Sequence, residues 1–197
     1  MKLFFDTETT GKFDFKAQPH ADHQPRMVQL AALLTNDEGL ELGQMNVIIR
    51  PEGFTIPDEV AALHGITQAI AESAGVQCKQ ARRMFREFWQ VADLAVAHNI
   101  SFDMGIIDGE RYRAAQGVVK WGKPINTVCT MQAMTPICKL PGKFGDYKWP
   151  KLQEAYRHAF GCEFLDAHNA MADVRACKEV YFWLRHQHEE QPTPKTP

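Results

Sequence analysis

Two carboxylates stand close together near the start of the sequence, at the end of an apolar run. The segment KLFF predicts a buried strand, and Asp6 and Glu8 follow it directly. Side chains two positions apart on a strand share a face, so both carboxylates can point into one cleft. A buried charge is costly unless it is paired or coordinates a metal. An Asp-x-Glu pair by itself is usually a solvated edge, so this pair needs partners elsewhere in the chain.

Two further acids stand near the starts of predicted helices. The segment AHNISFDMGII predicts a strand end followed by a helix that Ser101 caps, with Asp103 in its first turn. The segment DAHNAMADVRA places Asp173 in the opening turns of the last helix, five residues after His168. The helix dipole alone favours an acid at such a position, and a lone histidine is often simply exposed. Neither segment therefore specifies a site by itself.

Four converging carboxylates would repel one another strongly, and divalent cations would remove this repulsion. Oxygen ligands with room for water suit Mg²⁺ or Mn²⁺. Two such ions about 4 Å apart can hold the attacking and leaving oxygens of a phosphodiester displacement. An imidazole with an ordinary pKa of about 6.5 can accept a proton from the attacking water. If the strands before Asp6 and Asp103 are parallel, this chemistry accounts for four acids and one histidine at one sheet edge.

The elements that must position these residues follow an α/β order. Three strands come first, joined antiparallel, and strands then alternate with helices. This order predicts a mixed five-stranded sheet flanked by helices, in one domain over residues 1–187, followed by a disordered tail at 188–197. The predicted strands are residues 2–5, 27–35, 41–51, 93–99 and 124–130, and the predicted helices are 57–65, 67–73, 78–92, 102–116, 151–161 and 167–186.

The composition excludes some classes of protein. The chain has 197 residues and a formal net charge of -2, which argues against coating nucleic acid by bulk positive charge, although a local site remains compatible. No signal segment and no long apolar span is visible, so we expect a soluble protein without membrane contact. No two cysteines have zinc or redox spacing, which predicts reduced thiols in a cytoplasmic protein: Cys78, Cys129, Cys138, Cys162 and Cys177.

Three segments, in this order, resemble the three motifs of the DnaQ-like 3′–5′ exonucleases: FDTETTG, HNISFDMGII and HNAMADVRA. The histidine five residues before the last aspartate resembles the DEDDh branch. The resemblance extends through PRMVQLAALL and PDEVAALHGIT and covers nearly the whole chain up to the tail. It implies a ribonuclease H-like fold and a 3′–5′ exonuclease that uses two divalent cations, Mg²⁺ or Mn²⁺, and releases nucleoside 5′-monophosphates.

The resemblance also implies a role for each matched residue. Asp6 would bridge both metal ions, and Glu8 and Asp173 would hold the ion that carries the attacking water. Asp103 would support the second ion, directly or through water, and His168 would be the general base. Six further residues match family positions that meet the terminal 3′ nucleotide: Thr9, Thr10, Leu63, His64, Asn99 and Phe102. The threonines would contact it, Leu63 and His64 would pack against its base and sugar, and the last two would line the same pocket.

Three segments outside the motifs are weaker indications. The loop at residues 12–26 looks longer than in compact family members, and its Phe13 and Phe15 could either stack on a base or tuck onto the core. HADH, residues 20–23, lacks further ligands at zinc-like spacing, so we reject a metal site there. A solvated helix face is the favoured interpretation of three arginines: Arg82, Arg83 and Arg86.

The segment KLPGKFGDYKWPK, residues 139–151, interleaves basic and aromatic side chains, a pattern suited to single-stranded nucleic acid. A solvated loop held down by Trp149 explains it equally well. The residues concerned are Lys139, Lys143, Phe144, Asp146, Tyr147, Lys148, Trp149 and Lys151.

Single-stranded DNA with a free 3′ end is the expected substrate, and a DNA polymerase or repair protein is a possible partner. An RNA-directed enzyme similar to ribonuclease T or oligoribonuclease is the nearest alternative, because it would share every catalytic residue. Two other classes remain open: a noncatalytic, polymerase-accessory binding module that keeps the fold, and a structural α/β protein whose acids are solvated.

Overall fold

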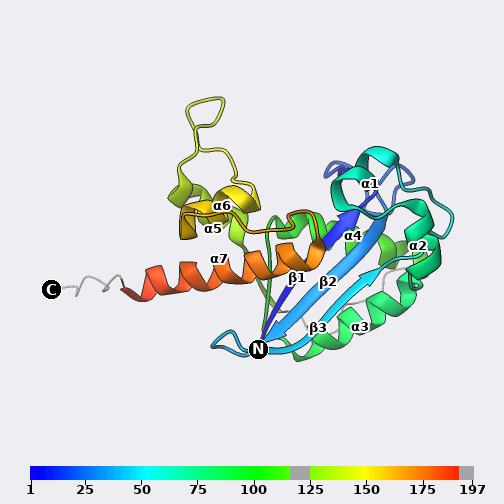
Figure 1. Ribbon diagram of the computed structural model, residues 1–197, viewed down its shortest axis with the longest axis horizontal. Helices are drawn as coiled ribbons and strands as arrows, with labels where there is room; N and C mark the ends of the chain where they lie inside the picture. The colour runs from blue at the N-terminus through cyan, green and yellow to red at the C-terminus, as the bar shows by residue number, and fades with distance from the viewer. Residues whose placement is uncertain (116–124, 191–197) are drawn as a thin grey trace.

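The computed structural model describes residues 1–115 and 125–190 and has a mixed five-stranded sheet at its centre (Figure 1). The strand order is β3-β2-β1-β4-β5. β2 pairs antiparallel with β1 and β3, whereas β4 runs parallel to β1 and β5. This arrangement confirms the predicted fold class. The strands are β1 (Lys2–Thr9), β2 (Met27–Thr35), β3 (Glu41–Ile48), β4 (Leu94–Ala97) and β5 (Asn126–Cys129).

The central strand, β1, is longer than the sequence pattern predicted. Its apolar residues Leu3, Phe4 and Phe5 are fully buried, because helices cover both faces of the sheet. The strand then continues to Thr9, since β2 pairs with it along its whole length. Asp6 and Glu8 therefore lie within the strand and not after it. The pairing register shifts between Glu8 and Thr9, and such irregularities often re-aim side chains next to functional sites.

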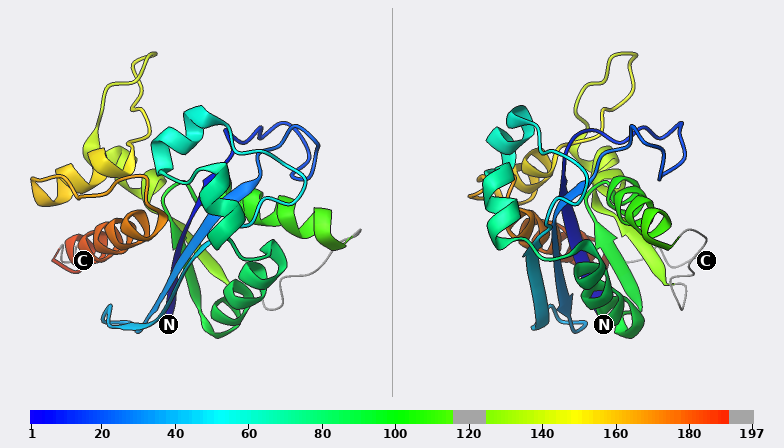
Figure 2. Two further views of the ribbon diagram at one scale, coloured as in Figure 1. Left: turned by 45° about the vertical axis from the view of Figure 1, so that its right-hand side comes forward. Right: turned by 90° about the vertical axis from the view of Figure 1, so that its right-hand side faces the viewer.

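Helices form a layer on each face of the sheet (Figures 1 and 2). On one face, α3 and α4 pack against Leu3 and Phe5. On the other, α7 packs against Phe4, and α5 and α6 pack in turn against α7. The helices are α1 (Asp58–His64), α2 (Gln68–Ala74), α3 (Cys78–Val91), α4 (Ile100–Ala115), α5 (Thr130–Cys138), α6 (Leu152–Phe160) and α7 (Ala170–Glu190).

Two helix starts differ from the prediction, and both differences follow from left-handed backbone. α4 begins at Ile100, so Ser101 lies in the first turn and is not the cap; Asn99, with φ 69°, precedes the helix. α7 begins at Ala170 and not near 167, because φ is 59° at Asp166 and 71° at His168. A right-handed helix cannot include residues in that region.

One helix was not predicted. Pro136 lies inside α5, and proline usually disfavours a helix interior. Met131 and Met134 are nevertheless buried, and Met134 packs with side chains of α6 and α7, so tertiary packing stabilises the helix.

The end of the chain also differs. α7 runs to Glu190, so residues 188–190 of the predicted disordered tail are helical. The remainder of that tail, 191–197, lies outside the described residues, as do the predicted helix end at 116 and strand start at 124. Within the part of the chain that the structure describes, no helix is both long enough and apolar enough to cross a membrane.

Candidate active site

The carboxylates of β1 face α7. Alternate residues of a strand point to opposite faces, so Asp6 and Glu8 share the face of Phe4, which packs against α7. Asp173 lies in the first turn of that helix. Burial raises the pKa of Asp6 well above its ordinary value, and the charges of three other acids add to the effect: Asp103, Asp173 and Glu8. All four predicted acids therefore converge at the carboxyl end of β1.

Asp103 reaches the site from the opposite helix layer. It is almost fully buried, and its Oδ1 accepts two hydrogen bonds from Thr7, at 3.0 Å from the backbone nitrogen and 2.7 Å from Oγ1. Sequence reasoning missed Thr7. The pattern does contain an indication, because the residue between two acids on a strand must point to the other face, where α4 packs. Thr7 thus fixes the carboxylate of Asp103 to the central strand.

In the absence of a cation, burial and mutual repulsion favour the protonated forms of these acids. Burial raises the pKa of Glu8 to about 8, and the charges of Asp173 and Asp103 contribute. Burial also raises the pKa of Asp103 to about 7, against the opposing effect of the Thr7 hydrogen bonds. The pKa of Asp173 rises to about 7, again through burial, although a hydrogen bond from the His168 backbone lowers it somewhat. Clustered, desolvated carboxylates of this kind favour a bound cation.

His168 lies beside two of these acids. Glu8, His168 and Asp173 each offer one ligand atom, and the three atoms all lie within 4.8 Å of one another. Asp6 and Asp103 lie outside this closest group. The left-handed backbone at His168 turns the chain just before α7, and the side chain of His168 is exposed. The turn therefore presents an imidazole to solvent and to the acids together.

Two buried polar atoms at the site have no hydrogen-bond partner among the described residues: Oδ1 of Asp173 and Nε2 of His64. Buried polar atoms are paired in the great majority of cases, so an exception needs an explanation. At Asp173, a cation would supply the missing partner, and the carboxylate oxygens of the neighbouring acids suit a divalent ion. The residues present fit a metal centre.

Among the residues predicted to bind the nucleotide, His64 interacts electrostatically with His168, which lies beside the acids. It ends α1, and its Nδ1 accepts a hydrogen bond from the backbone nitrogen of Ile66 at 3.1 Å. Burial lowers the pKa of His64, a hydrogen bond to the Thr9 backbone opposes this effect, and nearby His168 lowers the pKa as well. The ring lies beside the site, and its buried Nε2 makes no hydrogen bond of normal geometry with the described residues.

The two threonines after the acids make local contacts. Thr9 Oγ1 donates to the carbonyl oxygen of Gly11 at 2.7 Å. Thr10 Oγ1 accepts from the backbone nitrogen of Arg26 at 2.9 Å. Their hydroxyl groups thus fix the turn that leaves β1.

The other three residues predicted to bind the nucleotide lie on α1 and at the start of α4. Leu63 is 63% exposed on α1, next to His64. Asn99 precedes α4, and its carbonyl oxygen accepts from the backbone nitrogen of Phe102 at 2.8 Å. The ring of Phe102 packs against that of Phe13, with centroids 6.4 Å apart.

The two phenylalanines of the long loop at residues 12–26 differ in burial, so only one of them fits the prediction that they tuck onto the core. Phe13 packs against the core, whereas Phe15 is 61% exposed although its ring contacts that of Phe13. In the HADH segment, His23 Nε2 lies 3.3 Å from Asp14 Oδ2, and the ring of His20 lies against that of Tyr112. Of the arginines on α3, Arg83 and Arg86 are exposed as predicted, and Arg82 is half-buried.

Sequence reasoning also missed His98, which directly follows β4. Its Nδ1 lies 3.0 Å from Thr130 Oγ1, and its Nε2 lies 2.9 Å from the carbonyl oxygen of Pro150. Burial lowers the pKa of His98 to about 4, so the ring is neutral at physiological pH. His98 therefore joins β4 to the chain that enters α6.

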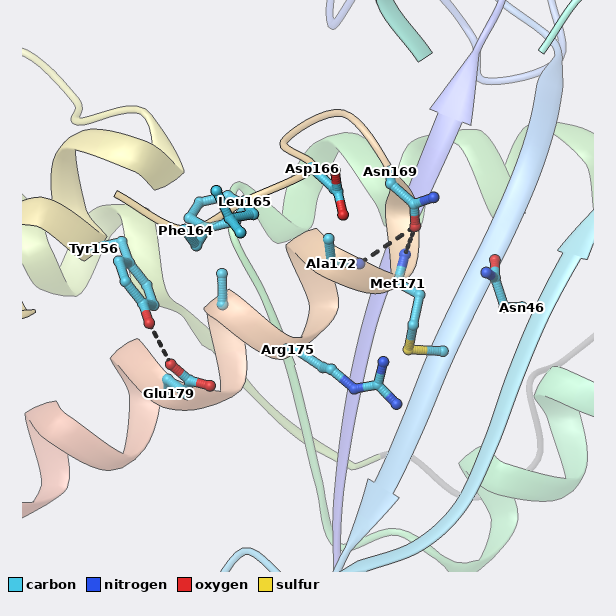
Figure 3. A pocket seen from close by; sticks show the side chains of 11 residues that line it. Asn46, Tyr156, Phe164, Leu165, Asp166, Asn169, Met171, Ala172, Arg175 and Glu179 are labelled. Atoms are coloured by element: carbon cyan, nitrogen blue, oxygen red, sulfur yellow. Dashed lines mark hydrogen bonds between the residues drawn. The ribbon is translucent and has the colours of Figure 1, made fainter. Parts of the chain in front are cut away.

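A pocket of about 400 Å³ is lined by residues of β3, α6, the segment before α7 and α7 itself (Figure 3). Asn169 lines it and also starts α7, because its Oδ1 accepts from the backbone nitrogen of Met171 at 3.1 Å. Arg175, also in the lining, donates to Gln44 Oε1 at 2.9 Å. None of the five predicted catalytic residues lines this pocket. It is separate from the acidic site.

Comparisons with known proteins identify the family of the chain. A family model described as "Exonuclease" (RNase_T) matches residues 3–181. An uncharacterized exonuclease, CP81, of Escherichia phage 186 is 26% identical over 187 residues, 88% of this chain and 82% of the phage protein. A DNA polymerase III subunit epsilon-like protein of Rhodobacter capsulatus is 36% identical over 103 residues, 52% of this chain but 13% of that protein.

Solved structures share the fold. A structure of exonuclease I has a TM-score of 0.75 and 21% identity, and the match covers 94% of this chain but 40% of that one. A zinc-bound complex of E. coli exonuclease I with single-stranded DNA has a TM-score of 0.73 and 20% identity, over 96% of this chain and 41% of that one. The chain thus spans well under half the length of exonuclease I.

Proposed function

The chain belongs to the exonuclease family, whose model spans residues 3–181, and from this premise we propose that it is a metal-dependent 3′–5′ exonuclease of the DEDDh type. Family membership makes it a nuclease. In the proposed reaction, it hydrolyses the 3′-terminal phosphodiester of single-stranded DNA and releases nucleoside 5′-monophosphates. The observation that supports this most is the convergence of four desolvated acids around a buried, unpartnered oxygen of Asp173, beside an exposed histidine.

Four carboxylates would hold the cations: Asp6, Glu8, Asp103 and Asp173. Two divalent ions, Mg²⁺ or Mn²⁺, would supply activation of water and stabilisation of the leaving 3′ oxygen. The chain's own contribution is to hold these oxygens in place before substrate arrives. β1 fixes Asp6 and Glu8 on one face, and Thr7 fixes Asp103 through two hydrogen bonds. Such preorganisation limits the rearrangement needed at the moment of reaction.

His168 is the proposed general base. Its ligand atom lies within 4.8 Å of those of Glu8 and Asp173, so it can accept a proton from water held between them. Because its side chain is exposed, the proton can pass on to solvent. His64, with Nε2 unpartnered, and Leu63, exposed beside it, are proposed to meet the terminal nucleotide, together with Thr9, Thr10, Asn99 and Phe102.

Single-stranded DNA is the favoured substrate because a structure similar in fold is a complex of E. coli exonuclease I with single-stranded DNA. An RNA-directed activity is the second candidate, since every acid would serve it equally. A DNA polymerase partner is suggested by the similarity to the epsilon-like protein of R. capsulatus. A noncatalytic module is disfavoured, because all five proposed catalytic residues are present.

A digestion panel tests the proposal. Single-stranded DNA, duplex DNA, mismatched duplex and RNA are incubated with Mg²⁺ or Mn²⁺, and with a chelator. We expect single-stranded DNA to be degraded fastest, and no product with the chelator. Asp173→Asn should be inactive, since it removes the buried carboxylate while keeping its size. Equal activity of this variant, or activity in the chelator, would refute the proposal.

A further inference from the structure

A small hairpin projects from the molecule between α5 and α6. In residues 139–149, the backbone nitrogen of Lys148 donates to the carbonyl oxygen of Leu140 at 3.0 Å, and that of Gly142 donates to Asp146 at 2.8 Å. Gly142 approaches Asp146 so closely that a Cβ there would lie 2.8 Å from its backbone oxygen. The turn is therefore a defined structure that needs glycine at this position.

The aromatic side chains of this hairpin are exposed. Phe144 is 92% exposed, Trp149 65% and Tyr147 48%. Trp149 therefore does not hold the loop against the core, which was the alternative interpretation of this segment. Exposed aromatic rings gathered on one projecting element indicate an interaction surface, because isolated soluble proteins rarely expose contiguous apolar patches.

The charges of the hairpin favour a polyanion. Lys139 and Lys143 are exposed and form no ion pair with any described acid, whereas Lys148 pairs with Glu154 at 2.6 Å. Asp146 is the one acid within residues 139–149. Protein-binding surfaces are depleted in lysine at their centre, whereas single-strand sites combine lysines with stacking rings.

The hairpin is joined to the catalytic edge of the sheet. Pro150, directly after it, is buried, and its carbonyl oxygen meets His98 Nε2 at 2.9 Å. His98 directly follows β4, the parallel neighbour of β1, and α4 with Asp103 comes next. Both views in Figure 2, with Figure 1, show the hairpin projecting at the end of the molecule where β1 terminates and α1 lies.

We propose that residues 139–149 bind the single-stranded DNA that continues 5′-ward from the terminal nucleotide, through base stacking on Phe144 and Trp149 and phosphate contacts from Lys139 and Lys143. This inference rests on the proposed function, because it assigns to the hairpin the strand whose 3′ end occupies the acidic site. A DNA strand that is bound both at the acidic site and at the hairpin would remain bound to the protein after each cleavage.

The test compares a long oligodeoxynucleotide with a dinucleotide as substrates. Phe144→Ala with Trp149→Ala should raise KM for the long strand roughly 10- to 100-fold, since each stacked base contributes appreciably. The effect should shrink as the strand is shortened. Phe144→Tyr with Trp149→Phe, which keeps the rings, should restore most of the affinity. Lys143→Gln should lower the slope of log affinity against log salt by about 0.7.

The matched control is Leu40→Ala with Leu42→Ala. These side chains are also exposed, at 65% and 51%, but lie at the opposite end of the sheet, near the turn between β2 and β3. The control should leave KM unchanged.

Two results separate the possible failures. If the native protein cleaves neither substrate, the proposed function fails. If it cleaves both and the alanine variant keeps the native KM on the long DNA, the hairpin binds something else, such as a protein, and the inference fails. A loss on long RNA with none on long DNA would overturn it as well.

Discussion

Asp173 has a buried carboxylate oxygen, Oδ1, without a hydrogen-bond partner among the described residues, and three other acids lie close to it. An arrangement that keeps like charges together destabilises the folded chain unless protons or cations are bound. Natural proteins retain such arrangements where function requires them. At the residue scale, therefore, the site's charge is the property to test.

The metal-free protein should lose stability as the pH rises. In the unfolded chain these acids ionise near their ordinary values of 3.8 and 4.5, whereas in the folded chain the pKa is about 7 for Asp103 and Asp173 and about 8 for Glu8. A carboxyl group whose pKa is higher in the folded than in the unfolded chain stabilises the fold fully at pH values below its unfolded pKa. This stabilisation is lost as the pH rises through its folded pKa. We therefore expect the free energy of unfolding of the metal-free protein to fall progressively between about pH 4 and pH 8.

Thermal unfolding in a chelator, followed across this pH range, checks the prediction. Added Mg²⁺ or Mn²⁺ should restore more stability at the alkaline end than at the acidic end, since cations bind the ionised acids. Metal-free stability that rises steadily over the same range would contradict the proposed electrostatics.

His168→Ala should reduce kcat by roughly 10²- to 10⁴-fold, the range expected for loss of a general base. The side chain is exposed, so the melting temperature should stay close to that of the native protein. Steady-state kinetics with Mg²⁺ measures the effect, and added imidazole should restore part of the rate. A variant with native kcat would remove the histidine from the mechanism.

Thr7→Val tests a positioning residue. The change removes the hydroxyl that donates to Asp103 at 2.7 Å but keeps the backbone donor and the side-chain shape. Losing one hydrogen bond to a buried carboxylate should lower stability by about 1–3 kcal/mol. If Thr7 positions Asp103, the variant also requires more metal for half-maximal activity, whereas Thr7→Ser should behave like the native protein. An unaltered metal requirement would leave Thr7 with a structural role alone.

At the element scale, the sequence pattern predicted most strands and helices but not every boundary. Alternation and apolar runs indicated β1 to β5, because burial dictates those patterns. The starts of α4 and α7 were misplaced, because left-handed residues such as Asn99 and His168 are set by tertiary contacts and not by local preference. α5 was missed because Pro136 conceals a helix that α6 and α7 stabilise.

Phe85→Ala tests the packing of α3 against the sheet. The side chain is fully buried, and its ring meets that of Phe5 with centroids 5.2 Å apart. Removing it should lower the free energy of unfolding by about 3–5 kcal/mol. Met84→Ala on the same helix is the control, since Met84 is 48% exposed and should change little. Urea denaturation measures both, and similar values for the two would contradict this account of the core.

At the scale of the whole molecule, the sheet places side chains from distant parts of the chain at one edge. Asp6 and Asp103 could be predicted to approach each other, because parallel strands end together. For Thr7, the alternation of the strand indicates the face but not the partner, Asp103. The contact of His98 with Pro150 could not be predicted, since no local pattern specifies it. The exposure of the hairpin at 139–149 could not be predicted either, because the same sequence is compatible with a loop that folds onto the core.

The match to exonuclease I covers 94% of this chain and 40% of that one. The projecting hairpin is the element of this chain that we propose for holding the strand.

Cleavage of single-stranded DNA labelled at its 5′ end tests the central proposal most directly. With Mg²⁺ or Mn²⁺, labelled fragments should shorten one nucleotide at a time from the 3′ end, nucleoside 5′-monophosphates should accumulate, and Asp173→Asn or a chelator should abolish both. Immediate release of the labelled nucleotide, internal cuts, or degradation that persists in the chelator would contradict a metal-dependent 3′–5′ exonuclease.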